Sequence, residues 1–145
     1  MSETLWYSQF PTPSYDARRV EPEYLISLMR DTSLTPGVDY VVVDTRRQDF
    51  QSYAILNAIN LPAHSFYPTL QTTTTVLSRI PKVIFHCNSC GAISRGSRVA
   101  GWYKDELKRR DISPEVSEAL ILEGGIKGFE NKYGKEGLLV KFDSL

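Results

Sequence analysis

The sequence predicts an α/β domain in which a central, mostly parallel sheet is flanked by helices. Two apolar runs, Tyr40–Asp44 and Lys82–His86, are typical of strands that are covered on both faces, as the inner strands of a parallel sheet are. A third run, Ala119–Leu122, has the same character. Segments with helical spacing of apolar residues alternate with these runs, and such alternation implies parallel pairing of the strands.

The N-terminal part begins with an irregular segment. Residues 1–19 contain two prolines and no periodic apolar face, so we expect an extended arm packed on the domain, with a partly disordered terminus as the alternative. Val20–Met29 is the first expected helix, because Pro22 suits a first helical turn and apolar residues follow at helical spacing. After the first buried strand, Arg47–Tyr53 is expected to contain a short turn of helix.

The middle of the chain is less clearly patterned. Ala58–Pro62 is expected to be a second short strand that Pro62 closes. His64–Ile80 contains a helix of undetermined extent. The run Thr72–Thr75 has low helix propensity, which leaves a loop as the alternative there.

A long amphipathic helix is expected from Arg95 onward. One apolar stripe at three-to-four spacing marks its inner face and consists of Val99, Trp102, Tyr103 and Leu107. The last expected helix is Ile126–Tyr133, and Gly134 is suited to end it.

Size and composition favour a single intracellular domain. The chain has 145 residues, with 17 basic and 17 acidic side chains, so its net charge is zero. This balance argues against a general nucleic-acid or anionic-membrane binder. We see neither a signal peptide nor an apolar stretch of membrane-spanning length. We therefore expect a cytoplasmic protein without nucleic-acid or membrane partners, with a nuclear location left open and the oligomeric state not predicted.

The strongest functional signal follows the strand Lys82–His86. Cys87 stands where this strand should end, a polar loop comes next, and Arg95 opens the long helix. Unpaired N–H groups at a helix N-terminus bind tetrahedral oxyanions, and the same field lowers the pKa of a thiol. We predict that Cys87 is a nucleophile held over a ring of backbone N–H groups.

The residues of this loop are expected to present their amides to an anion. The predicted anion-binding loop comprises Asn88, Ser89, Gly91, Ala92, Ile93, Ser94 and Gly96. Ser89 and Ser94 are expected to hydrogen-bond the thiolate or to stabilise the loop amides.

The chain has two cysteines, Cys87 and Cys90, in a Cys-x-x-Cys arrangement. Two cysteines are too few for a disulfide scaffold or a four-cysteine zinc site, and we expect no metal. A redox pair, or one reactive cysteine with a neighbour, is one interpretation. Two small buried apolar side chains are the alternative.

Three motifs occur in an order that resembles a rhodanese-fold domain. Asp44-Thr45-Arg46 resembles the Asp-x-Arg that follows a buried strand in this family, and Ala58-Ile59-Asn60-Leu61-Pro62 resembles its A-x-N-[IL]-P strand. Gly124-Gly125-Ile126-Lys127-Gly128-Phe129 resembles its G-G-[FIV]-x-x-[WF] ending. The resemblance covers most of residues 20–133. It implies a rhodanese-like single domain, with residues 1–19 as an N-terminal extended arm and residues 20–145 as the catalytic domain.

The cysteine loop resembles one branch of this family. Phe85-His86-Cys87 followed by Ser94-Arg95-Gly96 is similar to the His-Cys-x5-Arg-Gly loop of the cell-division-cycle dual-specificity phosphatases and the small eukaryotic arsenate reductases. Val99-Ala100-Gly101-Trp102-Tyr103 is similar to small fungal members. The resemblance implies that Cys87 is the nucleophile and Arg95 the oxyanion-binding arginine. The small size favours an arsenate reductase, with a phosphatase as the alternative. The alternative for Arg95 is an ordinary surface arginine at the start of a helix, without a role in anion binding.

The loop departs from the pattern of that branch in its length. Seven residues, not five, separate Cys87 from Arg95, whereas the four between Cys90 and Arg95 match the spacing of sulfurtransferase-like loops. Two further alternatives therefore stay open. One is a sulfurtransferase that carries a persulfide on Cys87 or Cys90, and the other is a non-catalytic rhodanese-fold binding module.

The reaction that the resemblance implies needs no bound cofactor. The substrate would be a small oxyanion or a phosphorylated compound. A reductase would draw electrons from an external thiol donor such as glutathione or glutaredoxin, and glutaredoxin would then be a partner. Cys90 is a candidate resolving thiol or redox partner of Cys87.

Four other side chains are assigned supporting or neutral roles. We expect Asp44 to orient the loop or Arg95 through a buried hydrogen bond. His86 is expected to point away from the site as structural support, because neighbouring side chains of a strand alternate. His64 is expected to lie in a loop and not to be a ligand. Arg98 is expected either to extend the positively charged opening of the site or to be solvated.

Overall fold

The computed structural model describes residues 5–91 and 94–142 of the chain. Five parallel strands form the central sheet in the order β1-β6-β5-β2-β4. These strands are β1 (Arg18–Val20), β2 (Tyr40–Asp44), β4 (Ile59–Asn60), β5 (Lys82–His86) and β6 (Glu118–Leu122). Two further strands, β3 (Tyr53–Ile55) and β7 (Leu139–Lys141), form a separate antiparallel pair.

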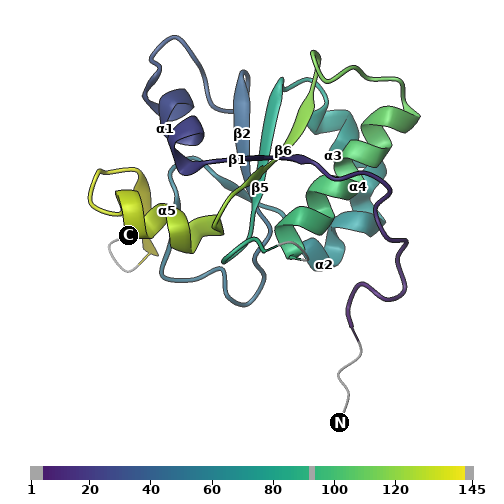
Figure 1. Cartoon of the computed structure of the whole chain (residues 1–145), viewed down its shortest axis with the longest axis horizontal. Coiled ribbons are helices and arrows are strands. Elements are labelled where there is room, and N and C mark those ends of the chain that lie inside the picture. Colours follow the sequence, from purple (N-terminus) through teal and green to yellow (C-terminus); the bar gives the residue numbers. More distant parts are fainter. Residues whose placement is uncertain (1–4, 92–93, 143–145) are drawn as a thin grey trace.

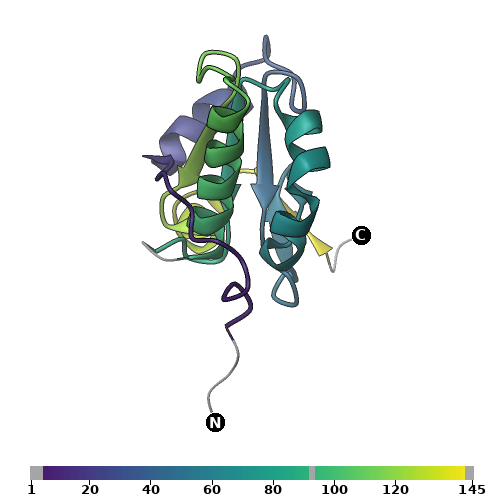
Figure 2. The same ribbon diagram turned by 90° about the vertical axis from the view of Figure 1, so that its right-hand side faces the viewer.

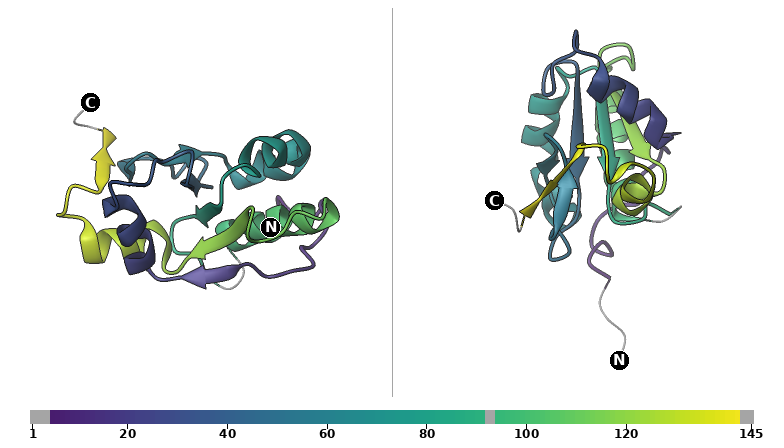
Figure 3. Two further views of the ribbon diagram at one scale, coloured as in Figure 1. Left: turned by 90° about the horizontal axis from the view of Figure 1, so that it is seen from above. Right: turned by 90° about the vertical axis from the view of Figure 1, so that its left-hand side faces the viewer.

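Helices cover both faces of the sheet (Figure 1). They are α1 (Pro22–Arg30), α2 (Ala63–Phe66), the 3-10 turn η1 (Tyr67–Thr69), α3 (Leu70–Leu77), α4 (Arg95–Arg109) and α5 (Gly125–Tyr133). Helices α1 and α5 lie on one side of the sheet, and α2, α3 and α4 lie on the other (Figure 3, left). The predicted α/β class, with a mostly parallel sheet flanked by helices, is confirmed.

Alternation along the inner strands supplies two apolar cores. Val41 and Val43 face α4 and join a cluster that contains Trp102, whereas Tyr40 and Val42 join the cluster of α1 and α5. Because both faces of these strands are buried, their sequences read as unbroken apolar runs.

The register of β2 and β5 positions the candidate site. Asp44 lies opposite His86 in the parallel ladder, so β2 and β5 end at the same edge of the sheet. Cys87 follows β5 directly and therefore leaves the sheet beside the end of β2. In open α/β sheets the carboxyl edge is where ligand sites form.

The short elements differ from the expectations. The prediction of a helical turn within Arg47–Tyr53 is wrong, because only a bend and a turn precede strand β3. The threonine run Thr72–Thr75 is helical, since Leu70 and Leu77 of the same helix are buried and their packing outweighs the low propensity of threonine. His64 lies in α2 and not in a loop.

The N-terminal segment runs beside α4 (Figure 2). The indole N–H of Trp102 donates to the Pro11 carbonyl at 2.8 Å, and the Lys104 ammonium donates to the Asp16 carbonyl at 2.8 Å. Strand β1 then crosses the expected boundary between residues 19 and 20 and joins the sheet edge beside β6. The division into an arm and a catalytic domain stays a prediction.

In the part of the chain that the structure describes, no helix is both long and apolar enough to cross a bilayer.

Candidate active site

Cys87 is buried at the end of β5, and its sulfur is surrounded by hydrogen-bond donors. The thiol of Cys90 interacts with it as a donor, as do the backbone N–H groups of Gly96 and Cys90, and the side chain of Ser94 lies near enough to stabilise the thiolate. These donors, led by Cys90, lower the pKa of the Cys87 thiol to about 4, although burial opposes them. Cys87 is therefore a thiolate at neutral pH, as a nucleophile requires.

Cys90 lies beside Cys87 and keeps its proton. The two sulfur atoms are 3.4 Å apart, and the backbone N–H of Cys87 donates to the Cys90 sulfur at 3.0 Å. The hydrogen bond to Cys87, followed by burial and by the negative charge of the Cys87 thiolate, raises the pKa of Cys90. The pair thus shares one proton and one negative charge near neutral pH.

Two elements hold the carbonyl groups of the loop. At the N-terminus of α5, the N–H of Ile126 donates to the Cys87 carbonyl at 3.1 Å and that of Lys127 to the Asn88 carbonyl at 3.0 Å. On the other side, the Arg19 guanidinium of β1 donates to the carbonyls of Cys90 and Gly91, both at 2.9 Å. Because the N–H and C=O of one peptide unit point in opposite directions, the amides of Asn88, Ser89 and Gly91, which follow the carbonyls of Cys87, Asn88 and Cys90, point away from α5 and Arg19.

Helix α4 begins directly at the loop. The Ser94 hydroxyl caps it by accepting the backbone N–H of Ser97 at 3.1 Å, and the Ser97 hydroxyl accepts the N–H of Ser94 at 2.9 Å. Gly96 follows this cap in the first turn of α4, and its backbone N–H helps to lower the pKa of the Cys87 thiol. The dipole of α4 adds to the stabilisation of the thiolate.

Arg95 is held by an acidic residue that sequence reasoning did not find. Both terminal nitrogens of its guanidinium donate to the Asp49 carboxylate, at 2.7 Å and 2.5 Å. This pairing lowers the pKa of Asp49 to about 2 and raises that of Arg95, which also interacts with the negative charges of Cys87 and Asp44. The side chain of Arg95 remains 24% exposed, so its guanidinium is accessible from solvent.

Asp44 has a different hydrogen-bond partner from the one expected. Its carboxylate accepts from the side chain of Arg46 at 2.8 to 3.0 Å, and among the described residues it accepts no hydrogen bond from Arg95 or the cysteine loop. Arg46 also donates to the carbonyls of Asp49 and Tyr53, at 3.2 Å and 2.7 Å. Asp44 therefore acts on Arg95 through its charge and through Arg46, which binds the turn that carries Asp49.

His86 is fully buried, and its ring contacts the backbone of the loop. Its Nδ1 is 2.9 Å from the Cys87 carbonyl, and its Nε2 is 3.7 Å from the Asp44 carboxylate. A carbonyl only accepts, so Nδ1 carries the hydrogen of that bond. The expected supporting role stays a prediction that this geometry favours.

Aromatic side chains of the N-terminal segment pack near the site. The Trp6 ring lies 4.6 Å from the ring of His64, and the Arg98 guanidinium lies 3.6 Å over the ring of Tyr7. Burial, followed by the charges of Arg47 and Arg95, lowers the pKa of His64, which places His64 within the electrostatic field of Arg95. Arg98 is therefore not simply solvated, because its guanidinium packs on the ring of Tyr7.

The other predicted loop residues are partly accounted for. Ser89 is exposed, and Gly91 contributes its carbonyl to Arg19. Ala92 and Ile93 lie outside the described residues. Within the described residues no group of three or more His, Cys, Asp or Glu could hold a metal ion.

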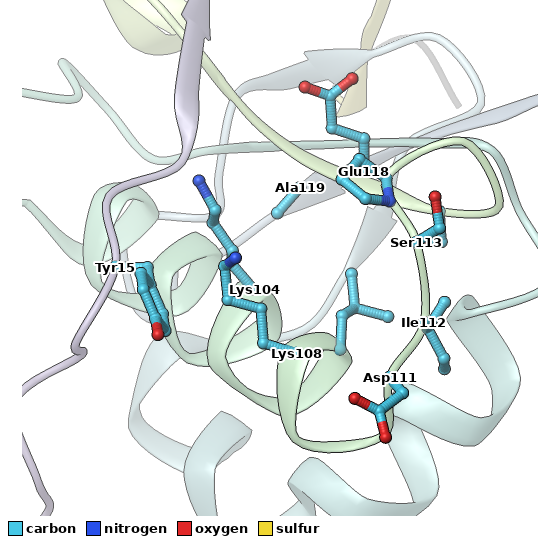
Figure 4. A pocket seen from close by; sticks show the side chains of 11 residues that line it. Tyr15, Lys104, Lys108, Asp111, Ile112, Ser113, Glu118 and Ala119 are labelled. Carbon is cyan, nitrogen blue, oxygen red and sulfur yellow. The ribbon is translucent and has the colours of Figure 1, made fainter.

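A separate hollow lies at the opposite edge of the sheet. It has a volume of about 400 Å³ and is lined by Lys104 and Lys108 of α4, by the loop before β6, and by Tyr15 (Figure 4). The Lys108 ammonium lies 4.6 Å from the centre of the Tyr15 ring. No cysteine lines this hollow, and it contributes nothing to the thiolate site.

Comparison with solved structures shows which known proteins share this fold. No family model matches the chain. Solved structures with the same fold include an As-Sb reductase from Leishmania major, with a TM-score of 0.69, 24% identity and coverage of 85% of this chain and 84% of that one. Ygr203w, a yeast protein tyrosine phosphatase of the rhodanese family, has a TM-score of 0.70 and 20% identity, with coverage of 86% and 92%.

A curated relative decides the assignment. Arsenical-resistance protein 2 of Saccharomyces cerevisiae is 35% identical over 100 residues, which cover 63% of this chain and 75% of that protein. The chain belongs to the rhodanese-fold family. Within it, the chain belongs to the branch of the cell-division-cycle phosphatases and eukaryotic arsenate reductases, as its motifs predict.

The rhodanese-fold motifs of this chain have physical roles in the structure. Asp44 and Arg46 of the Asp-x-Arg motif form the buried ion pair that supports the Asp49 turn. Gly125 of the G-G motif has a φ of +59° and lies so close to the Asn88 carbonyl oxygen that a Cβ would stand 2.6 Å from it. Gly96, after the arginine, leaves room for the Cys90 sulfur, which a Cβ would approach to 2.7 Å.

Proposed function

We propose that this rhodanese-fold protein reduces arsenate, with Cys87 as the nucleophile and Arg95 as the oxyanion-binding arginine. The observation that carries the proposal is the ionised Cys87 sulfur, held among amide donors at the start of α4 beside an accessible arginine. Its similarity to arsenical-resistance protein 2 supports arsenate over other tetrahedral oxyanions.

The first chemical step is attack of the Cys87 thiolate on arsenic. An arsenate oxygen leaves as water, and a sulfur–arsenic bond forms. The Arg95 guanidinium and the loop amides stabilise the negative oxygens, and the planar fork of arginine suits a tetrahedral oxyanion because it donates two parallel hydrogen bonds. Asp49 accepts hydrogen bonds from both terminal nitrogens of Arg95 and so fixes the direction of the guanidinium, whose remaining N–H groups bind the oxyanion in this proposal.

Reduction of arsenic then requires thiol electrons. A thiol donor such as glutathione, with glutaredoxin as a protein partner, supplies them in this proposal. A cytoplasmic location suits this chemistry, because the cytosol keeps thiols reduced.

Phosphoester hydrolysis is the second candidate, since a thiolate with amide and arginine donors also suits attack on phosphorus. Water would then resolve the thiophosphate intermediate.

A non-catalytic binding module is disfavoured, because such a module has no need of a thiol pKa near 4. Persulfide transfer remains the outcome to consider if both reactions fail.

A paired assay on one sample tests the proposal. Arsenite production with glutathione and glutaredoxin is measured beside hydrolysis of an aryl phosphate, each repeated with Cys87→Ser. We expect arsenite production that depends on Cys87, with little hydrolysis. Hydrolysis that depends on Cys87, without arsenite, would make the protein a phosphatase, and silence in both assays would contradict the proposal.

A matched pair of arginine variants tests the role of Arg95. Arg95→Lys keeps the charge but loses the planar fork, and we expect kcat/KM for arsenate to fall about a hundredfold. Arg98→Lys makes the same change three residues later on α4, where the side chain packs on Tyr7, and should lower kcat/KM less than threefold. Equal losses in the two variants would exclude a specific role for Arg95.

A further inference from the structure

The two cysteines form an isolated, buried dithiol. Their sulfur atoms are 3.4 Å apart, and Cys87 and Cys90 are only 3% and 1% exposed. Because the chain has no other cysteine, any disulfide within one chain joins these two residues. A disulfide bond is about 2.05 Å long, so the sulfurs need to approach by only about 1.4 Å to form one.

The backbone around Cys90 holds its sulfur against Cys87. The N–H of Cys87 donates to the Cys90 sulfur at 3.0 Å, and the missing Cβ of Gly96 provides the space that this sulfur occupies. Arg19 fixes the Cys90 carbonyl at 2.9 Å from the other side. Cys90 therefore points at Cys87 and not into solvent, as a reaction partner of that sulfur must.

We propose that Cys90 is the second catalytic thiol, which attacks the Cys87 sulfur of the arsenate adduct and releases arsenite, leaving a Cys87–Cys90 disulfide. This inference rests on the proposed arsenate reduction. It replaces attack by an external thiol at the adduct with attack by a thiol of the same chain. The external thiol then acts only later, on the disulfide.

The atoms and electrons of this sequence balance. In the first step the Cys87 thiolate, dihydrogen arsenate and a proton give the Cys87–arsenic(V) adduct and water. In the second step a sulfur–sulfur bond forms as the sulfur–arsenic bond breaks, and its electron pair stays on arsenic, which becomes arsenic(III). The Cys90 proton ends on the departing arsenite. The two cysteines are oxidised by two electrons, and a dithiol reductant or two molecules of a monothiol restore them.

The order of the steps follows from the shared proton of the pair. While Cys87 is a thiolate, its charge and its hydrogen bond hold the proton on Cys90. Bonding to arsenic removes the thiolate charge of Cys87, so two of the causes that raise the pKa of Cys90 disappear together. The pKa of Cys90 therefore falls toward its ordinary value once the adduct exists, although burial still opposes ionisation, so Cys90 reacts after Cys87 and does not compete with it for arsenate.

The reductant of the disulfide is identified by chemical class. It must attack a sulfur of the pair through a mixed disulfide, which a protein dithiol does and then resolves within itself. Small monothiols need two successive encounters for the same result. We therefore assign the partner to the class of protein dithiol reductants, which includes thioredoxin-like and dithiol glutaredoxin-like proteins.

A single-turnover experiment tests the inference. The fully reduced protein, freed of all small thiols, is mixed with excess arsenate, and arsenite and remaining protein thiols are measured. We expect one arsenite per chain and loss of both thiols, with a Cys87–Cys90 disulfide found by mass spectrometry of the intact and digested chain. Arsenite yield without this disulfide, or no arsenite at all, would overturn the inference.

Cys90→Ser provides the second arm. Serine preserves the size of the side chain but cannot form a disulfide, so we expect the single-turnover arsenite yield to fall at least twentyfold. With glutathione and glutaredoxin present, the external thiol reaches the adduct, and we expect the variant to regain part of its turnover, which shows that it folds and binds arsenate. A single-turnover yield equal to that of the wild type would show that Cys90 is not the second thiol.

The two proposals fail in different ways. If arsenite forms with external thiols and depends on Cys87, but the single turnover gives none, arsenate reduction stands and the role of Cys90 is wrong. If no condition gives arsenite that depends on Cys87, the proposed function and this inference fall together. Cys90→Ala gives a further check, since removing the whole heteroatom must abolish the single turnover as serine does.

Discussion

At the scale of single residues, Cys87 carries the negative charge of the cysteine pair and Cys90 carries the proton. A pH titration of the Cys87 thiol tests this assignment. The Cys90 thiol is the largest cause that brings the pKa of Cys87 to about 4. We expect Cys90→Ala to raise the pKa of Cys87 by at least one unit, because the backbone and Ser94 donors remain while the thiol donor is lost. Ultraviolet absorbance of the thiolate during a pH titration measures this shift. An unchanged pKa would mean that the amides alone hold the charge.

The same thiolate makes stability depend on pH. Between about pH 4 and pH 9 the unfolded thiol of Cys87 binds a proton that the folded one does not, so unfolding takes up a proton. The contribution of Cys87 to stability is therefore full above pH 9 and is lost as pH falls toward 4. Urea unfolding should show the advantage of the wild type over Cys87→Ser growing with pH across this window. A difference independent of pH would contradict the low pKa.

Asp49 orients Arg95. Replacing Asp49 by asparagine removes the negative charge of residue 49 and keeps the shape of its side chain. We expect Asp49→Asn to raise KM for arsenate about tenfold, or about 1.4 kcal/mol, with a smaller effect on kcat, because the guanidinium loses its fixed direction. Glu118→Gln is the control, since Glu118 pairs with Arg18 and Lys82 at the far edge of the sheet. Equal KM values for the two variants would exclude the positioning role.

The residues that sequence reasoning missed share a physical character. Asp49 and Arg19 lie in segments without periodicity, and each contacts the loop only because the chain folds back over 46 or 71 positions. Cys87 and Arg95 could be found because nucleophile, polar loop and helix start are contiguous in sequence. A positioning contact between distant segments leaves no such local pattern.

At the scale of elements, the start of α5 supports the cysteine loop from beneath. Gly125 has a φ of +59°, and an added Cβ would stand 2.6 Å from the Asn88 carbonyl oxygen. Ile126 and Lys127 follow with the N–H groups that bind the loop carbonyls. The glycine is therefore required both for its backbone conformation and for the close approach of helix and loop.

Substitution of this glycine separates the two requirements. We expect Gly125→Ala to lower the free energy of unfolding by roughly 3 kcal/mol and to slow alkylation of Cys87 at neutral pH, because the clash moves α5 away from the loop. Gly137→Ala is the matched control, with a φ of +76° and nothing within 4 Å of its Cβ position. Its loss should be only about 1 kcal/mol, with unchanged alkylation. Urea unfolding and thiol labelling measure both effects. Equal losses of stability and equal alkylation rates in the two variants would show that the close contact between Gly125 and the loop is not required.

Elements differ in how readily their sequences predict them. The bounds of β2 and β5 follow from their apolar runs, since burial on both faces marks every residue. Strands β1, β3 and β7 each have three residues, which is too short for an alternation to be recognised. In α3 the packing of Leu70 and Leu77 outweighs the preferences of the threonines, which no local propensity could reveal.

At the scale of the whole molecule, three distant parts of the chain hold one loop. Strand β1 contributes Arg19, α5 contributes its first amides, and α4 contributes its capped N-terminus. The parallel sheet places these parts together, because the carboxyl ends of its strands share an edge. The loop therefore depends on the completed fold and not on its own sequence.

The N-terminal segment divides into two parts with different expected effects on this loop. Trp6 and Phe10 pack on Trp102, whereas Arg19 of β1 binds the loop carbonyls. A chain that starts at residue 12 should lose roughly 3 kcal/mol of stability, because the aromatic contacts are gone, while the pKa of Cys87 stays near 4. Its remaining tryptophan, Trp102, should show red-shifted fluorescence.

Removal of β1 as well should reach the active site. A chain that starts at residue 21 lacks the two hydrogen bonds of Arg19 to the Cys90 and Gly91 carbonyls, and we expect its thiolate pKa to rise and its arsenate turnover to fall at least tenfold. Arg19→Met in the full chain is the control, since it removes the same bonds without removing the strand. If the chain from residue 12 already lost the low pKa, or if Arg19→Met kept full turnover, the loop would be held by other contacts.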